Sequence, residues 1–131
     1  MADTAPVKLT AFASVFTVTD VGRSLAFYLE RLGFIEEFKL GDPPTYAIIE
    51  RDMVQLHLMP ASQAAEALGL SSIYVFVAGV DALHDQLVAR GCPIDSAPQD
   101  YFYGMREMSV RDPDGNRLTF GEEVRKPAAS S

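Results

Sequence analysis

The chain has one cysteine, two histidines and no tryptophan in 131 residues. Because Cys92 has no second cysteine to pair with, no internal disulfide can form, and we expect a reducing, cytoplasmic location. We interpret Cys92 as a small packing residue beside Pro93, not as a catalytic thiol. No apolar run approaches the roughly 20 residues of a membrane span. No basic segment leads into an apolar run at the N-terminus, so a secretory signal is not expected.

Basic residues are also scarce, with 11 Lys and Arg against 18 Asp and Glu, which gives a net charge of −7. The acidic residues are spread along the chain and do not form a tail. This balance disfavours nucleic-acid binding, which depends on clustered basic residues that replace phosphate counterions. It is compatible with attraction of a cationic ligand, and it is equally explained by a need for solubility.

Apolar residues make up 48% of the chain, enough for the core of one compact domain. We expect this domain to span residues 8–125 and to consist of two repeats, at about 8–60 and 70–125. The small, polar and Pro-bearing ends, residues 1–7 and 126–131, are expected to be flexible.

The first repeat is predicted to contain a strand, a helix and three more strands. Residues 13–18 are β-branched and aromatic, and Thr19-Asp20 is a good N-cap for the following helix. The helix carries an apolar stripe at helical spacing, formed by Leu25, Tyr28, Leu29 and Leu32. Gly33 ends it in a left-handed conformation. Further strands are predicted at 35–40, 46–50 and 54–58, with breaks at 41–44 and 51–53.

The second repeat is predicted to follow the same order. A strand at 73–77 precedes a helix that Gly91 ends, and Leu25, Leu29 and Gly33 correspond to Leu83, Leu87 and Gly91 at one offset. The next strand is expected to begin at 93–95 and to lead into a long loop at 96–104. A closing hairpin of 106–110 and 117–120 follows. Since neither half is large enough to be stable alone, we expect the halves to pack together or to exchange with a partner chain.

The turn of the closing hairpin is Asp112-Pro113-Asp114-Gly115-Asn116. Pro presets the φ angle of a turn, and Gly or Asn tolerates a positive φ. These properties account for the motif structurally, so no catalytic role is assigned to Asp112 or Asp114.

The element order, together with Asp20–Tyr28 (DVGRSLAFY) and Leu32-Gly33-Phe34, resembles the glyoxalase, bleomycin-resistance and ring-cleaving dioxygenase superfamily. The closing stretch, Tyr103–Glu107 and Asp112–Asn116, is similar to its bleomycin-resistance branch in particular. The likeness extends from about Phe12 to Glu122. It implies an α+β fold in which two βαβββ modules form a cupped mixed sheet, the vicinal-oxygen-chelate fold.

The resemblance also implies four positions at which metalloenzymes of the superfamily hold a divalent ion. In this chain those positions are Ala13, Gln55, Ser72 and Thr119. Such side chains bind transition metals poorly compared with His, Cys or carboxylate, so we expect neither a metal nor another cofactor. His57 shares a side of its strand with Gln55 and is interpreted as a hydrogen-bonded wall residue. His84, near the polar side of the second helix, is expected to be exposed.

Without a metal, the cup is expected to be a ligand pocket lined by alternating strand residues. The candidate ligand-binding residues are Phe38, Tyr46, Gln55, His57, Tyr74, Tyr101, Phe102, Tyr103, Arg117 and Thr119, with Val15 and Thr17 on the same face. The three consecutive aromatics at 101–103 cannot all point inward. They would stack on a ligand or, equally, cover a sheet edge or dimer seam.

Three hypotheses remain at this level. The first is a metal-free homodimer that sequesters a planar or cationic small molecule in grooves built from both chains. A bleomycin-type glycopeptide is the example that the resemblance suggests, and sequestration would confer antibiotic resistance. The second is a non-metal lyase or isomerase of the same fold that uses His57 in proton transfer, aided by Gln55, Tyr74 or Arg117. The third is a metalloenzyme with a displaced site formed by His57 and Glu50 or Glu107. The first is the main prediction, with no nucleic-acid or membrane partner.

Overall fold

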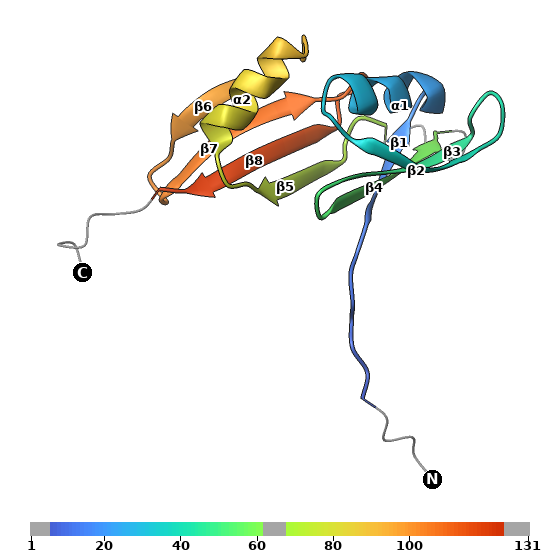
Figure 1. Cartoon of the computed structure of the whole chain (residues 1–131), viewed down its shortest axis with the longest axis horizontal. Helices are drawn as coiled ribbons and strands as arrows, with labels where there is room; N and C mark the ends of the chain where they lie inside the picture. The colour runs from blue at the N-terminus through green and yellow to red at the C-terminus, as the bar shows by residue number, and fades with distance from the viewer. Residues whose placement is uncertain (1–5, 62–67, 125–131) are drawn as a thin grey trace.

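The computed structural model describes residues 6–61 and 68–124 and divides them into two modules of identical element order (Figure 1). The first module contains β1 (Ser14–Val18), α1 (Val21–Glu30), β2 (Ile35–Leu40), β3 (Tyr46–Arg51) and β4 (Val54–Pro60). The second contains β5 (Ser72–Phe76), α2 (Val80–Ala89), β6 (Ser96–Asp100), β7 (Met105–Arg111) and β8 (Arg117–Glu123). The predicted α+β class and the two βαβββ modules are confirmed.

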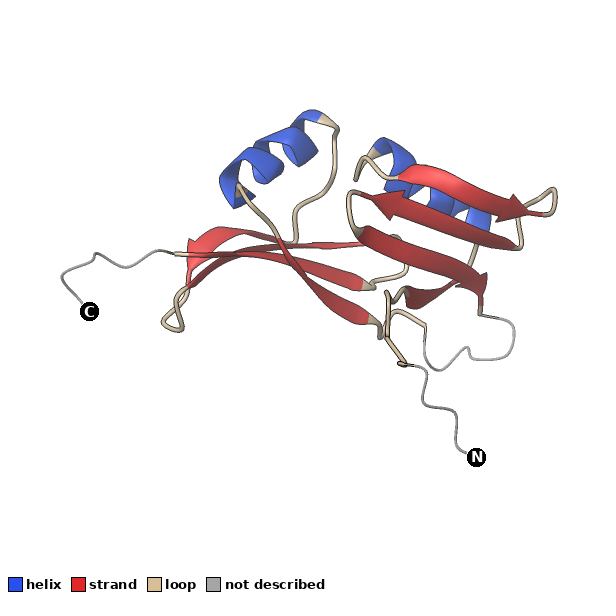
Figure 2. Cartoon of the chain, turned by 60° about the horizontal axis from the view of Figure 1, so that its bottom comes forward, coloured by secondary structure: helices blue, strands red, loops and turns tan. Residues whose placement is uncertain are grey.

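Each module forms its own four-stranded mixed sheet. The strand orders are β1-β4-β3-β2 and β5-β8-β7-β6, and β1/β4 and β5/β8 are the parallel pairs. One helix covers the same side of each sheet, and the two sheets lie side by side (Figures 1 and 2). The eight strands expected in the cup therefore divide into two sheets, whose edge strands β1 and β5 face the middle of the molecule.

Alternation along the strands decides which residues face the helices. Phe16 and Val18 of β1 and Leu56 and Leu58 of β4 are buried, whereas Val15 and His57 point to the other face. The same pattern buries Met108, Val110, Leu118 and Phe120 in the second module. The faces turned away from the helices are thus free for a ligand, and the predicted site residues on β1, β4, β5 and β8 lie there.

The two helices begin differently. Asp20 caps α1 as predicted, because its carboxylate accepts a hydrogen bond from the Arg23 amide at 3.0 Å. No side chain of the preceding turn caps α2, which begins after Gly79. Instead Glu122, from β8, accepts hydrogen bonds from the Gly79 and Val80 amides at 2.8 and 3.0 Å. Gly33 and Gly91 end the helices with φ of 74° and 76°, as predicted.

The predicted long loop at 96–104 is wrong, and so is a strand at 93–95. Residues 96–100 form β6, and only residues 101–104 form the turn to β7. Pro98 obscured this strand, because proline cannot donate to a sheet ladder. β6 tolerates it because it is an edge strand whose pairing with β7 shifts register between Ser96 and Gln99.

The Asp112–Asn116 turn connects the two modules. The Tyr28 hydroxyl of α1 donates to buried Asp112 at 3.1 Å, and the Thr19 hydroxyl donates to Asp114 at 2.6 Å. The Asn116 amide donates to the Thr17 carbonyl at 3.3 Å. The two modules therefore pack against each other within one chain through a polar seam, one of the two arrangements expected from the sequence.

The domain boundaries at 8 and 125 stay predictions, since residues 1–5 and 125–131 lie outside the described part of the chain.

The single cysteine and one of the two histidines can be compared with their predicted environments. Cys92 is buried, as expected of a packing residue. His84 is half-buried rather than exposed, because it lies one helical turn from buried Val80 and Leu87, at the margin of the apolar stripe. Across the described residues, no helix has the length and apolarity to cross a membrane.

Candidate functional site

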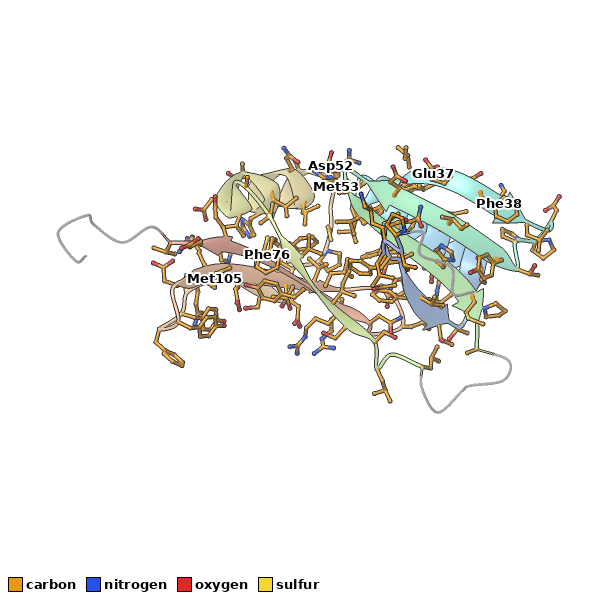
Figure 3. All side chains as sticks on the ribbon, turned by 90° about the horizontal axis from the view of Figure 1, so that it is seen from below. Glu37, Phe38, Asp52, Met53, Phe76 and Met105 are labelled. Carbon is orange, nitrogen blue, oxygen red and sulfur yellow. The ribbon has the colours of Figure 1, made fainter. Side chains whose placement is uncertain are left out.

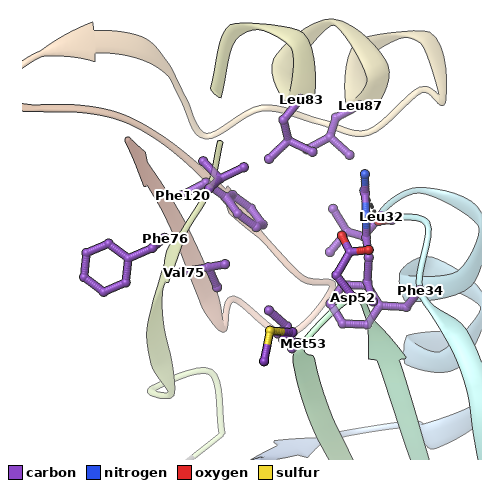
Figure 4. Close-up of a pocket in the computed structure, with 12 residues that line it drawn as sticks. Leu32, Phe34, Asp52, Met53, Val75, Phe76, Leu83, Leu87 and Phe120 are labelled. Atoms are coloured by element: carbon purple, nitrogen blue, oxygen red, sulfur yellow. Dashed lines mark hydrogen bonds between the residues drawn. The ribbon is translucent and has the colours of Figure 1, made fainter. Parts of the chain in front are cut away.

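Three cavities lie along and between the modules. The helix-side cavity, of about 300 Å³, lies between the modules and is mostly apolar. Leu83 and Leu87 of α2 form one wall, and Leu32 and Phe34 face them from the first module (Figure 4). Among the described residues, Arg51 and Asp52 are the charged ones that line it. This cavity could therefore bind an apolar group, but it offers few side chains for hydrogen bonding or catalysis.

The edge cavity, of about 370 Å³, lies where β1 and β4 approach β5. It brings together two predicted site residues, Gln55 and Tyr74, with Phe12 and Phe76 as further aromatic walls. Met53 and Phe76 line both this cavity and the helix-side cavity. Met53 projects into the space between the modules, whereas the ring of Phe76 turns away from the first module (Figures 3 and 4).

The second-sheet cavity, of about 240 Å³, lies on the open face of β7 and β8. It gathers three predicted residues, Tyr101, Arg117 and Thr119, and adds Glu107 and Asp95. The Asp95 carboxylate accepts from the Ser109 hydroxyl at 3.0 Å and pairs with Arg111 at 3.4 Å. This is the most polar of the three cavities.

Five predicted residues line none of these cavities: Phe38, Tyr46, His57, Phe102 and Tyr103. Phe102 is 96% exposed at the tip of the β6–β7 turn, which confirms that the three aromatics cannot all point inward. Tyr101 and Tyr103 stack with ring centroids 5.5 Å apart and planes 12° apart. Phe38 is half-exposed on the edge strand β2, away from the second sheet (Figure 3).

His57 has a partner that the sequence did not reveal. The Tyr46 hydroxyl lies 2.6 Å from His57 Nδ1, and the two rings meet edge to face. Register explains the contact, because Ile48 is paired with His57, and Tyr46 lies on the same face of β3 two residues away. This hydrogen bond to one ring nitrogen orients the imidazole and leaves the other nitrogen for a substrate or ligand.

Glu107 is the centre of a second polar group. Its two carboxylate oxygens accept hydrogen bonds from the Tyr74 hydroxyl at 2.7 Å and from the Tyr103 hydroxyl at 2.8 Å. Partial burial and these interactions with Glu107 raise the pKa of Tyr74 to about 12. The hydrogen bond to Glu107 likewise raises the pKa of Tyr103. Both phenols therefore stay protonated near neutral pH and hold the carboxylate in place.

Gly121 makes this group possible. Tyr74 reaches from β5 across β8 to β7, and its path passes directly over Gly121, which is paired with Glu107. A Cβ atom at position 121 would overlap the Tyr74 hydroxyl. Sequence reasoning named Glu107 only as a candidate ligand of a displaced metal site, although it alternates with buried Met108 along β7 and so lies on the open face. A glycine inside a strand was the available signal of a close approach.

The donor set at the inherited metal positions does not fit a divalent ion. Val15 pairs with His57, and Tyr74 pairs with Thr119. Since Val15 and Tyr74 hold the same place before their helices, His57 rather than Gln55 is the counterpart of Thr119. Even this register supplies one imidazole beside alanine, serine and threonine, too weak a set for a transition metal.

The alternative metal site considered from the sequence, formed by His57 and Glu50 or Glu107, is not supported by the structure. Among residues 6–61 and 68–124, no three His, Cys, Asp or Glu side chains gather where an ion could bind. His57 is engaged with Tyr46 in the first sheet, and Glu107 is engaged with two tyrosines in the second. The geometry instead offers aromatic and polar surfaces for an organic ligand.

Comparison with known proteins gives a consistent result. Residues 10–120 match the model of the Glyoxalase/Bleomycin resistance protein/Dioxygenase superfamily. The chain is 25% identical over 125 residues to a bleomycin resistance protein of Geobacillus stearothermophilus, covering 82% of this chain and 92% of the relative. It is also similar to the crystal structure of a bleomycin-binding protein from bleomycin-producing Streptomyces verticillus complexed with copper(II)-bleomycin. That match has 31% identity and a TM-score of 0.70, over 88% of this chain and 97% of the other.

A third similar structure is a glyoxalase / bleomycin resistance protein from Catenulispora acidiphila. It shares 26% identity and a TM-score of 0.70, over 86% of this chain and 96% of that one. All three likenesses extend over most of both chains, so they concern the whole fold and not a single motif.

Proposed function

Because the chain belongs to the Glyoxalase/Bleomycin resistance protein/Dioxygenase superfamily, we propose that it is a metal-free binding protein that sequesters a planar or cationic small molecule. The observation that carries the proposal is the exchange of metal ligands for a surface of aromatic rings and neutral polar groups around the edge and second-sheet cavities. The 31% identical neighbour, which was crystallised with copper(II)-bleomycin, supports a bleomycin-type glycopeptide as the first ligand to test.

The groove of the proposed binding protein is completed by a second copy of the chain. Large apolar side chains are exposed beside the edge cavity, where Met53 is 99% and Phe76 is 80% exposed and Phe12 is also exposed. Exposed apolar groups gathered in this way favour an interface. A homodimer that buries them would close the open side of the edge cavity and exclude water from the ligand.

Calorimetric titration with copper(II)-bleomycin and with metal-free bleomycin tests the ligand. Binding to the native state alone stabilises it by about 2.7 kcal/mol at a ligand concentration 100 times Kd, which raises Tm by about 8 °C for a chain of this size. We expect saturable heat at a stoichiometry of one per groove and a matching rise in Tm. Absence of both would contradict a bleomycin-type ligand.

Sedimentation velocity tests the dimer. Phe76→Asp places a charge in the proposed interface, whereas Phe38→Asp changes an exposed ring on β2, far from Phe76 (Figure 3). We expect the wild type and Phe38→Asp to sediment as dimers and Phe76→Asp to sediment as a monomer. A monomeric wild type at micromolar concentration would contradict the shared groove.

The Tyr46–His57 contact favours a second candidate function, proton transfer by a lyase or isomerase. The candidate base has a hydrogen-bonded partner at 2.6 Å that orients its ring, as general-base work needs. Hydrogen–deuterium exchange at carbon in dihydroxyacetone and acetoin, followed by NMR in D₂O, tests it. We expect an enzyme to lose the exchange in His57→Ala and to weaken it in Tyr46→Phe. Exchange at the buffer rate with the wild type would count against this function.

A further inference from the structure

We propose that Glu107, with Tyr74, Tyr101 and Tyr103, forms a subsite for an alkylated ammonium group, which is the cationic end of the ligand. This inference depends on the proposed binding function and makes it more specific. It assigns one chemical group of the ligand to one place on the second sheet.

The carboxylate of Glu107 is held but not neutralised. Two phenol hydroxyls fix its oxygens at 2.7 and 2.8 Å, and each oxygen keeps a further lone pair. Within the described residues, no Lys, Arg or His forms an ion pair with Glu107. Its neighbour Arg106 lies on the other face of β7 and pairs with Asp81 and Asp100, both at 3.0 Å. The negative charge is thus available to a bound cation.

Aromatic residues lie beside this charge. Tyr74 and Tyr103 bond it through their hydroxyls, and Tyr101, which lines the same cavity, stacks on Tyr103. Tyr74 in turn meets Phe76 with ring centroids 5.2 Å apart. Ring faces attract cations, and in water the net gain favours alkylated ammonium groups, because these lose little hydration energy when they leave water. The combination of several rings with one fixed carboxylate therefore selects a bulky cation over a small, strongly hydrated one.

The rest of the second-sheet cavity points to the same ligand class. A hard metal ion requires six or more oxygen ligands, whereas this cavity offers two carboxylates, and Asp95 is already engaged with Ser109 and Arg111. Arg117 lines the same cavity, and its backbone lies four positions along β8 from Gly121, about 13 Å from the point opposite Glu107. Among the described residues, Arg117 forms no ion pair with Glu107.

Choline and 3,3-dimethylbutan-1-ol have nearly the same shape, but only choline is charged, so a difference in their affinities measures the contribution of the positive charge. Their affinities for the full chain are measured by ligand-observed NMR titration. We expect choline to bind at least about 10-fold more tightly than the neutral alcohol. Glu107→Gln is expected to abolish this difference, and Tyr103→Phe to reduce it about 3-fold. Glu37→Gln, which removes the same charge from exposed β2, serves as the control and is expected to behave like the wild type.

Equal affinities for the two probes, or an unchanged preference in folded Glu107→Gln, would overturn the subsite. Thermal melting of each variant establishes that it is folded. Titration of the wild type with copper(II)-bleomycin separates the two proposals. If the antibiotic binds while choline shows no charge preference, the subsite is wrong and the binding function stands. If choline shows the preference and the antibiotic does not bind, the subsite stands and the proposed ligand falls.

Discussion

Arg31 and Arg90 each donate a hydrogen bond to the end of the other's helix. Arg31 Nη1 bonds the Arg90 carbonyl at 2.8 Å, and Arg90 Nη1 bonds the Glu30 carbonyl at 3.1 Å. Both residues are the C-caps of their helices, and the two contacts are related but offset by one residue, since Arg31 bonds the C-cap carbonyl of α2 and Arg90 bonds the last helical carbonyl of α1. Cations at helix C-termini satisfy carbonyls that have no partner within the helix and interact favourably with its dipole. The pair therefore ties the modules together by using both helix ends.

Replacing these arginines should weaken the seam cooperatively. We expect Arg31→Ala and Arg90→Ala each to lower the free energy of unfolding by about 1 kcal/mol, because each removes one hydrogen bond to a helix end at an exposed site. A double-mutant cycle followed by urea unfolding should give a coupling of about 0.5 kcal/mol. Lys39→Ala, on exposed β2, is the control. Strict additivity of the two changes would contradict a shared junction.

The Asp112–Asn116 turn should contribute more to stability than a surface hairpin does. Asp112→Ala removes the acceptor of the Tyr28 hydroxyl and of two backbone amides, those of Asp114 and Asn116. Since these donors lie in a buried or half-buried region, we expect a loss of about 3 kcal/mol or more in urea unfolding. Tyr28→Phe leaves Asp112 bonded to Asn116 and should cost about 1 kcal/mol.

Asp85→Ala, which removes an exposed carboxylate from α2, is the matched control for the turn and should change stability little. A loss for Asp112→Ala no larger than that of Asp85→Ala would show that the two modules do not depend on this turn.

Local patterns predicted most of the fold because each element carries its own signal. Asp20 and Gly33 mark the ends of α1, and alternating apolar residues mark β1, β4 and β8. The turn chemistry of Asp112–Asn116 predicted a hairpin correctly. Its docking on α1 could not be predicted, because the partners of Asp114 and Asn116 lie almost a hundred residues earlier in the chain. β6 was missed because Pro98 suits an edge strand and a loop equally.

For the candidate site, the alternation of residues along each strand predicted which face a side chain lies on but not which residues it contacts. That pattern placed Gln55, His57 and Tyr74 on the open faces, where the structure has them. It could not show that Tyr46 bonds His57, or that Tyr74 crosses a neighbouring strand to reach Glu107. Both contacts depend on the register between strands, which tertiary packing sets. Their roles in ligand binding stay predictions.

Gly121→Ala should release Tyr74 without unfolding the sheet. The added Cβ would overlap the Tyr74 hydroxyl, and that hydroxyl is the far end of a half-exposed side chain that is free to move. The Tyr74–Glu107 hydrogen bond should therefore break, and the pKa of Tyr74, about 12 in the wild type, should fall toward its usual value near 10. NMR of ¹³Cζ-labelled tyrosine during an alkaline titration measures this pKa.

Tyr74→Phe identifies the Tyr74 resonance in that titration. A pKa that stays near 12 in Gly121→Ala would mean that the phenol does not lie over Gly121. Because the raised pKa favours the folded state only while the phenol is protonated, its contribution in the wild type is complete below about pH 10. It should be lost as the pH rises toward 12.

Glu122 should make α2 sensitive to acid. Hydrogen bonds from the Val80 and Gly79 amides lower the pKa of this carboxyl below its usual 4.5. A lowered pKa in the folded state means that the carboxylate contributes stability above the unfolded value, and this contribution is lost as the pH falls through the folded value. Urea unfolding at pH 7 and at successive values below 4.5 should therefore show that the wild type loses more stability than Glu122→Gln. Gln lacks the titrating charge but keeps an acceptor oxygen.

Glu123→Gln, at the exposed end of the same strand, is the control and should lose stability with acid as the wild type does. Equal acid sensitivity of the wild type and Glu122→Gln would mean that α2 does not depend on an ionised carboxylate at its N-terminus.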